Sequence, residues 1–551
     1  MEKDEERQSC RKAVLALILL SVLAWLPGFF TLPPLDRDES RFAQASKQML
    51  ETGDFVDIKL GEANRYEKPV GIYWLQAAST SVLGLGTRNA IWTYRVPSFL
   101  GALAAVLATF HIARLFAGIE AGFAAGAILA LSVLLMAEAK IAKTDAVLAG
   151  TVAVAQWAVM RAYLDARGRI AVSSMRTALI GWAAFGLGVL VKGPLIALVC
   201  GLSVVAVSIW DRDASWLKRL YPLRGVLVAL AIVLPWLIAI GIASDGAFFR
   251  QSLGQDFGGK VMGDAEAHGA PPGYFAVLMF ATFWPGSLAL LPALLLAFRR
   301  SKEPAIRYLL CWAITTWLMF EIVPTKLPHY VLPAYPALAV LCGVWLTEEG
   351  ARPSLWSRVA AFASLAAFVG VGLALAAFFA LAPERLGGGS PWWLYAEALA
   401  GALLIGVAFF VADRKMKGAA ATLAALILYE LGGYETVPRL QSLWLSPRLA
   451  AAVERHAQTG DPPVITAGYA EPSATFLLGT GTRLLLGDEA GKAAAQGGGL
   501  AAVELGEQSA FLESLASAGA RAGAVEEIEG LNYSRGREAR ITLYRVTRDA
   551  R

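Results

Sequence analysis

Charged residues are scarce in this chain. Asp, Glu, Lys and Arg make up 17% of its 551 residues, whereas hydrophobic residues make up 56% and the mean hydropathy is +0.53. An ordinary soluble domain carries about 25% charged residues, so this composition excludes that class and indicates a protein whose main solvent is lipid. The net charge of +5 does not indicate nucleic-acid binding, because Lys and Arg are dispersed in short clusters between apolar runs.

Cysteine is also rare, and its four positions lack the spacing of a metal site. Cys10 lies in the N-terminal tail, whereas the other three lie inside or at the ends of apolar segments, so we expect no disulfide. The first 32 residues lack a small-x-small cleavage site before Pro33. We therefore expect this segment to stay in the protein as its first membrane helix.

Thirteen apolar segments are long enough to cross a bilayer, which takes about 20 helical residues. They are 13–32, 96–117, 120–137, 145–164, 176–192, 194–210, 224–243, 274–298, 305–322, 331–347, 358–382, 394–412 and 418–434. The connections 161–176, 211–224, 299–307 and 413–417 are all basic. Because basic loops stay in the cytoplasm, we predict an all-α polytopic membrane protein with a cytoplasmic N-terminus. The longer loops and the C-terminal segment then lie on the opposite side.

Two segments outside the spans have structure of their own. Loop 33–95 contains amphipathic stretches at 39–52 and 71–83, which are typical of helices lying in the membrane interface; a soluble mini-domain is the alternative. From about residue 435, β-like runs alternate with Ala-rich helical stretches. The sequence thus predicts a transmembrane domain over 1–434 and a small α/β domain over 435–551, without a nucleotide-binding fingerprint.

Ionisable residues gather in the loops on the predicted non-cytoplasmic side. Asp38 and Glu39 follow the first span, Glu67 and Lys68 lie further along the same loop, and Asp145 starts a later span. Ionisable groups at membrane depth are costly and usually face a cavity or a partner. The alternative is a purely structural role, in which Asp38, Glu39 and Asp145 only cap helix N-termini. Their common side of the membrane favours a functional site.

Carboxylates and lysines on one membrane face suit the transfer of a group from an anionic, lipid-anchored donor. Lys and Arg neutralise a phosphate leaving group. A carboxylate such as Asp38 or Asp145 accepts a proton from a hydroxyl or stabilises positive charge on a sugar. We expect no required cofactor. His268 with Glu67 or Glu266 is the candidate for a divalent metal site, such as one for zinc, and a simple hydrogen-bonded His is the alternative.

Several short motifs carry a resemblance to a known family. The most specific are Asp38-Glu39-Ser40-Arg41-Phe42-Ala43, Tyr66-Glu67-Lys68-Pro69 followed by Tyr73-Trp74, and Lys326-Leu327-Pro328-x-Tyr330. At these residues the chain resembles the GT-C class of polyprenyl-phosphate-dependent membrane glycosyltransferases, which includes protein O-mannosyltransferases. It is most similar to the branch that transfers 4-amino-4-deoxy-L-arabinose from undecaprenyl phosphate to lipid A.

The resemblance implies a GT-C fold of about thirteen transmembrane helices in the bacterial inner membrane, with a periplasmic C-terminal α/β domain. It implies an inverting transfer in which Asp38 is the catalytic carboxylate, supported by Glu39 and Arg41. It implies an undecaprenyl-phosphate-linked sugar donor, lipid A or another envelope acceptor, and membrane lipids as partners. The implied residues for the donor phosphate and substrate are Arg41, Tyr66, Lys68, Tyr73, Lys192, Lys326 and Tyr330.

The sugar and the acceptor stay open at this point. This chain carries Asp36-Arg37 ahead of the Asp-Glu pair and Lys143-Thr144 ahead of Asp145, so a hexuronic acid, hexose or other pentose donor remains an alternative. A transporter of lipid-linked glycans and a non-catalytic glycolipid sensor are the alternatives from other classes. Transporters often show repeated halves, and this sequence has no such repeat.

Overall fold

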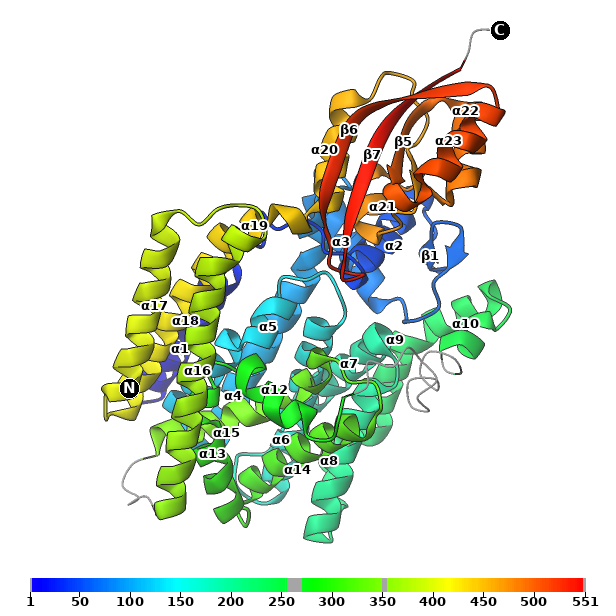
Figure 1. Cartoon of the computed structure of the whole chain (residues 1–551). Coiled ribbons are helices and arrows are strands. Elements are labelled where there is room, and N and C mark those ends of the chain that lie inside the picture. Colours follow the sequence, from blue (N-terminus) through cyan, green and yellow to red (C-terminus); the bar gives the residue numbers. More distant parts are fainter. Residues whose placement is uncertain (1, 253, 255–269, 349–353, 549–551) are drawn as a thin grey trace.

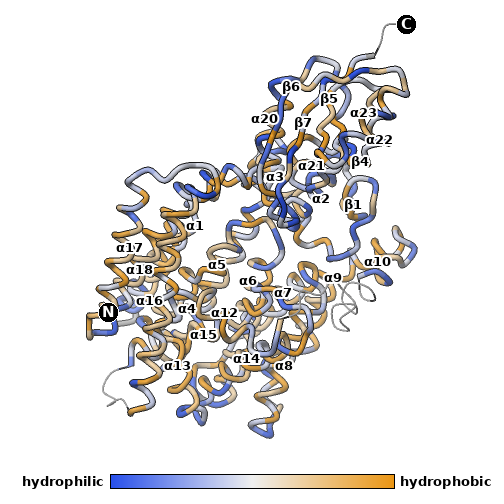
Figure 2. Tube along the Cα trace, in the orientation of Figure 1, coloured by the Kyte–Doolittle hydropathy of each residue, from blue (hydrophilic) through white to orange (hydrophobic). Residues whose placement is uncertain are grey.

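The computed structural model describes residues 2–252, 254, 270–348 and 354–548, and most of them form a bundle of apolar helices (Figures 1 and 2). Its helices are α1 (Glu2–Trp25), α4 (Ile91–Leu131), α5 (Val133–Glu138), α6 (Asp145–Ala166), α7 (Met175–Lys192), α8 (Leu195–Asp211), α9 (Pro222–Ala243), α12 (Tyr274–Thr282), α13 (Ser287–Arg299), α14 (Pro304–Ile322), α15 (Tyr335–Thr347), α16 (Leu355–Arg385), α17 (Trp392–Phe410) and α18 (Arg414–Glu430). Within the described part, nine helical segments are long and apolar enough to cross a membrane. This is a multi-pass membrane protein of mainly α-helical fold, as predicted.

The predicted spans fall on these helices, with local departures. Spans 96–117 and 120–137 correspond to the two halves of α4, which are two helices joined at the non-helical Gly118 (φ 85°), and the second span continues into α5. Span 274–298 is interrupted between α12 and α13, where the peptide bond before Pro285 is cis. Span 331–347 begins as the 3₁₀ segment η3 (Pro328–Ala334) and continues as α15. Each irregularity lies at a glycine or proline, where the regular helix is weakest.

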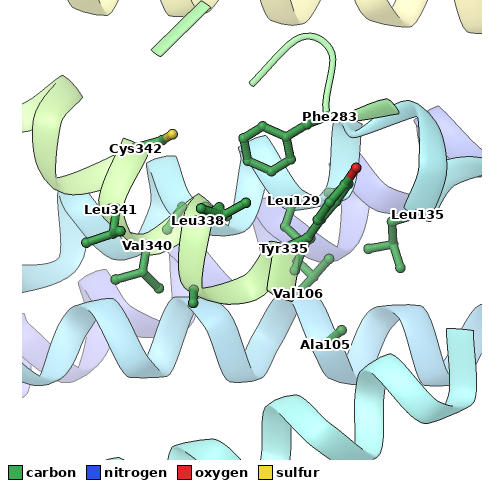
Figure 3. Packing of buried hydrophobic residues seen from close by; sticks show 14 of the residues in the cluster. Ala105, Val106, Leu129, Leu135, Phe283, Tyr335, Leu338, Val340, Leu341 and Cys342 are labelled. Atoms are coloured by element: carbon green, nitrogen blue, oxygen red, sulfur yellow. The ribbon is translucent and has the colours of Figure 1, made fainter. Parts of the chain in front are cut away.

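Close packing of small residues holds the bundle together. α15 lies along α4, and a side chain at Gly343 would come within 2.6 Å of the Ala121 carbonyl oxygen. Figure 3 shows this contact region, where Tyr335 packs edge-on against Phe283 at 5.0 Å between ring centroids. Lipid is as apolar as the helix faces, so helices associate in membranes through such close backbone approach.

Two helices of loop 33–95 lie at one end of the bundle. α2 (Asp38–Thr52) and α3 (Gly71–Leu83) are joined by the short strands β1 (Lys59–Leu60) and β2 (Ala63–Asn64). α3 packs on α4 and α7, while α2 packs on α3 and is covered from the other side by the C-terminal segment (Figure 1). The predicted helices 39–52 and 71–83 therefore exist. We call this end of the bundle the site face.

The C-terminal residues form an α/β unit above the site face (Figure 1). Its five-stranded sheet has the order β4-β3-β5-β7-β6, with β3, β4 and β5 parallel and β6 and β7 antiparallel. The strands are β3 (Ile465–Ala467), β4 (Arg483–Leu485), β5 (Gly499–Glu504), β6 (Ala520–Asn532) and β7 (Arg537–Arg548). Its helices are α20 (Leu445–His456), α21 (Pro472–Leu478), α22 (Gly487–Gly497) and α23 (Gln508–Ser517). The unit is more hydrophilic than the bundle (Figure 2).

The link from α18 to the C-terminal unit is made of short turns. They are the π-helical turn η4 (Leu431–Thr436), α19 (Val437–Arg439) and the 3₁₀ turn η5 (Gln441–Leu443). Four further short elements are η1 (Ser215–Leu220), α10 (Ala247–Phe249), η3 and η6 (Leu505–Glu507). The unit then contacts α2 through α21, because Lys47 donates a hydrogen bond of 3.0 Å to the Phe476 carbonyl and its ammonium lies over the Phe476 ring.

Candidate functional site

A cavity of about 340 Å³ opens at the site face. Its polar wall comes from the start of α2, from residues 65–69, from the start of α6 and from the end of α7. Its apolar wall comes from α8, from α14 and from the segment before η3, through residues such as Leu198, Phe320 and Leu327. The cavity thus joins charged groups near the membrane surface to a hydrophobic face within the bundle.

Asp38 is the first residue of α2 and lines this cavity with an exposed side chain. Within the described part of the chain, its carboxylate has no hydrogen-bond or ion-pair partner, and it does not cap its own helix. Asp38 therefore does not act as a helix cap. An accessible carboxylate in a cavity that also carries cations is available to a bound molecule.

Asp145, by contrast, is buried and paired. Its carboxylate lies 2.5 Å from the Lys192 ammonium and 3.7 Å from the Lys143 ammonium. Lys143 also pairs with Glu138 at 2.9 Å. Burial alone would lower the pKa of Lys143, but the carboxylates of Glu138 and Asp145 raise it above its usual value, so Lys143 stays charged. His329 completes the cluster, with Nε2 3.8 Å from Asp145.

The chain turns sharply directly after Lys192. Gly193 ends α7 with φ 64°, in the left-handed region that favours glycine, and Pro194 then leads into α8. This turn keeps Lys192 at the helix end, facing Asp145, and its ammonium also lies 6.0 Å from the ring centroid of Tyr330. Both residues line the cavity.

Residues 65–68 supply a second cationic group. The Lys68 ammonium donates to the Glu67 carbonyl at 3.0 Å, and both residues line the cavity. Arg65 is buried, donates to the Tyr73 hydroxyl at 3.2 Å and pairs with Glu67 at 3.1 Å. Its guanidinium lies over the Phe42 ring at 5.1 Å, so it is held rigidly at the cavity wall.

Among the other predicted residues, Glu39 is not one of the described lining residues of the cavity but holds the neighbouring elements in place. It is fully buried and receives two hydrogen bonds from the Arg95 guanidinium, of 2.8 and 3.0 Å. It also accepts the amides of Leu35 and Ala142, each at 2.9 Å. Glu39 therefore ties α2 to α4 and to the segment before α6. Arg41 is half-buried on α2 and is not among the described lining residues.

Three more predicted residues also lie outside the described cavity lining. Tyr66 donates to Asp57 at 2.7 Å and packs in the loop core. Tyr73 is buried and its hydroxyl holds Arg65, so it acts on the cavity through that guanidinium. Lys326 is buried and pairs with Glu321 at 2.8 Å, which fixes the segment between α14 and η3.

Of the predicted metal pair, His268 lies outside the described residues, so the pair stays a prediction. Glu67 lines the cavity and pairs with Arg65. A different group, Glu138, Asp145 and His329, has its ligand atoms within 4.8 Å of one another. The ammonium groups of Lys143 and Lys192 already neutralise its two carboxylates, so this group does not fit a resident dication as it stands.

Sequence reasoning missed Arg65 and Glu138 and gave His329 no role. Arg65 directly precedes the Tyr66-Glu67-Lys68 motif, and Glu138 is a charged residue directly after the predicted span 120–137. Both were therefore detectable as ionisable groups next to a motif or a span end. Their partners were not detectable, because these pairs join residues from different helices.

Comparison with known proteins identifies the fold. The profile of the dolichyl-phosphate-mannose-protein mannosyltransferase family matches residues 67–238. The crystal structure of ArnT from Cupriavidus metallidurans bound to undecaprenyl phosphate superposes with a TM-score of 0.76 at 20% identity, over 96% of this chain and 97% of that one. This chain has the GT-C fold. The archaeal oligosaccharyltransferase AglB from Archaeoglobus fulgidus also matches, with a TM-score of 0.51 at 14% identity, over 86% of this chain and 64% of that one.

Two curated relatives of this chain have the same kind of name. An undecaprenyl phosphate-alpha-4-amino-4-deoxy-L-arabinose arabinosyl transferase from Pseudomonas aeruginosa is 29% identical over 392 residues, which are 69% of this chain and 66% of the relative. One from Pseudomonas fluorescens is 30% identical over 58% of this chain and 55% of the relative. The chain thus spans somewhat less than two thirds of these relatives. The resemblance predicted from the motifs is confirmed.

Proposed function

We propose that this protein is a membrane glycosyltransferase that moves a sugar from undecaprenyl phosphate to lipid A or lipopolysaccharide. The proposed sugar is 4-amino-4-deoxy-L-arabinose, which the names of the curated relatives support. The proposed location is the bacterial inner membrane, with the N-terminus in the cytoplasm. The site face and the C-terminal unit then lie in the periplasm, in agreement with the basic loops at the other end.

One observation carries the proposal: Asp38 is an accessible carboxylate in a cavity that is also lined by Lys68 and Lys192 and whose far wall is apolar. A polyprenyl-phosphate sugar has the complementary chemistry. Its polyprenyl chain suits the wall formed by Leu198, Phe320 and neighbouring residues, and its phosphate suits Lys68 and Lys192.

The reaction follows from this arrangement. The acceptor oxygen attacks C1 of the sugar, the bond between C1 and the phosphate oxygen breaks, and polyprenyl phosphate leaves with the bonding electrons, so the anomeric centre is inverted. Lys68 and Lys192 stabilise the charge that develops on the phosphate. Asp38 removes a proton if the acceptor is a hydroxyl. If the acceptor is a lipid A phosphate, which is already ionised, Asp38 stabilises the positive charge growing on the sugar.

The test is transfer by the purified protein in lipid vesicles. It is incubated with undecaprenyl-phosphate-linked aminoarabinose, other pentoses, hexoses and hexuronic acids in turn, with lipid A as acceptor, and the lipid is analysed for the added sugar mass. We expect transfer from the aminoarabinose donor, lowered at least about 100-fold by Asp38→Asn. Full activity in Asp38→Asn would exclude the proposed role of this carboxylate.

Two matched variants separate chemistry from donor binding. Asp54→Asn is the control for Asp38→Asn, because Asp54 lies in the same loop, only holds the local turn at Val56 and Asp57, and asparagine keeps that hydrogen-bond acceptor. Lys68→Ala should weaken donor binding about tenfold or more, since a charge-assisted contact to the phosphate is lost. Unchanged donor affinity in that variant would remove Lys68 from the proposed phosphate site.

A further inference from the structure

The turn between β6 and β7, residues 533–536, lies against the segment that leads into α2. The Tyr533 hydroxyl accepts a hydrogen bond of 2.7 Å from the Asp36 amide. The Arg37 guanidinium donates to the Ser534 carbonyl oxygen. These contacts join residues almost 500 positions apart, and they end one or two residues before Asp38.

A second contact reaches the same segment from α21. The Ser473 hydroxyl donates to the Asp36 carboxylate. It also lies 2.6 Å from the Ser446 hydroxyl, which lies 2.8 Å from the Tyr469 hydroxyl in the interior of the C-terminal unit. Because a hydroxyl donates only one proton, a Ser473 that donates to Asp36 accepts from Ser446. The resulting row of hydroxyls connects Asp36 to the core of the unit.

The backbone between these contacts and Asp38 is strained. Arg37 has φ 64° and ψ −115°, a conformation that residues with a side chain rarely adopt, and α2 begins at the next residue. On the other side of Asp38, Glu39 is fixed by Arg95 and by the Ala142 amide. Asp38 thus lies between two anchors, one from the bundle and one from the C-terminal unit.

We propose that the C-terminal unit positions Asp38 in the cavity, with Tyr533 and Ser473 as the positioning residues. This inference rests on the proposed function for the role of Asp38. Neither residue is among the described lining residues of the cavity, so they act on Asp38 through Asp36 and Arg37. A strained turn persists only where its surroundings over-determine it. Without these contacts, Arg37 relaxes and the Asp38 carboxylate points elsewhere.

The test measures turnover and donor binding in the full-length protein in vesicles. Tyr533→Phe keeps the ring and removes the hydroxyl, and Ser473→Ala removes the other contact. We expect each variant to lower kcat about tenfold or more, as for a misplaced catalytic group, with donor Kd unchanged within about twofold. Tyr395→Phe and Ser390→Ala are matched controls, because they remove hydroxyl hydrogen bonds to Glu384 and the Ala380 carbonyl, away from this turn.

Hydrogen exchange supplies a readout that does not need activity. Amides 35–42 should exchange about tenfold faster in both variants, while those of α3 stay unchanged. Unchanged exchange, or faster exchange with wild-type kcat, overturns the positioning inference. If the wild-type protein transfers no sugar from any donor tested, the proposed function fails instead, and the exchange data alone still decide whether the turn holds the segment before α2.

Discussion

The buried pair of Glu39 and Arg95 gives the sharpest test of how the site is supported. Replacing Glu39 with Gln keeps the size of the side chain but removes its charge. The Arg95 guanidinium is fully buried and donates both to Glu39 and to carbonyl oxygens of the segment between α1 and α2, such as that of Leu32. The Gln amide nitrogen would face Arg95 donors, so the variant loses the charge pair and gains a donor that meets another donor.

The cost can be worked out from the burial of the pair. Removing one partner of a buried ion pair costs about 3 to 5 kcal/mol, because the remaining charge has no compensation. At about 1.4 kcal/mol per factor of ten, the local opening equilibrium near Glu39 should rise by about two to almost four orders of magnitude. The Ala142 amide, which also donates to Glu39, should lose protection together with the start of α2.

Hydrogen exchange followed by mass spectrometry measures this effect peptide by peptide. We expect faster exchange in residues 33–42 and 139–145, and unchanged exchange in α17. Glu120→Gln is the control, because its pair with Lys415 is exposed and should be worth less than about 1 kcal/mol. If Glu39→Gln changed exchange no more than Glu120→Gln does, the view of Glu39 as the anchor of α2 would be wrong.

Three further predictions follow from other contacts. Burial raises the pKa of Asp36 from 3.8 to about 6, so the folded protein binds a proton at Asp36 more tightly than the unfolded chain does. The free energy of unfolding of the wild type should therefore fall by about 3 kcal/mol as pH rises from about 4 to above 6. Denaturation of Asp36→Asn should not show this dependence on pH. Lys326→Met should lower Tm but leave donor Kd unchanged, because it breaks the ion pair with Glu321 and the hydrogen bond to the Pro271 carbonyl, and neither partner is among the described lining residues of the cavity. Dialysis against a chelator should leave transfer within about twofold, since Lys143 and Lys192 already neutralise the carboxylate cluster; loss of activity restored by zinc would refute this.

The fold was predictable wherever one physical signal dominates. Bilayer thickness sets the length of an apolar span, and loop charge sets its direction, so most helix positions followed from the sequence. The break at Gly118 agrees with the two spans predicted on either side of it, whereas the interruption of span 274–298 between α12 and α13 did not follow from the sequence. Whether an apolar segment runs as one helix or is interrupted depends on the neighbours that pack around it, and these are not visible in a local pattern.

The candidate site was also predictable only in part from the sequence. Asp38, Lys68 and Lys192 stand in or next to loops of the site face, so topology alone brought them to one side, and the structure brings them to one cavity. Glu39 and Tyr73 were predicted from the same motifs, but they are supporting residues by their contacts. A motif gives the position of a residue in the chain, whereas the side of a helix that faces the cavity is fixed only by long-range packing.

The two predicted carboxylates, Asp38 and Asp145, have the same functional group but lie in different surroundings. Asp145 is buried between the ammonium groups of Lys143 and Lys192, so its negative charge is stabilised and it is a poor acceptor of a proton. Asp38 has no such partner among the described residues and is open to the cavity. Different surroundings suit two carboxylates to different tasks. In the proposed reaction, Asp145 holds Lys192 toward the phosphate, and Asp38 acts on the sugar or its acceptor.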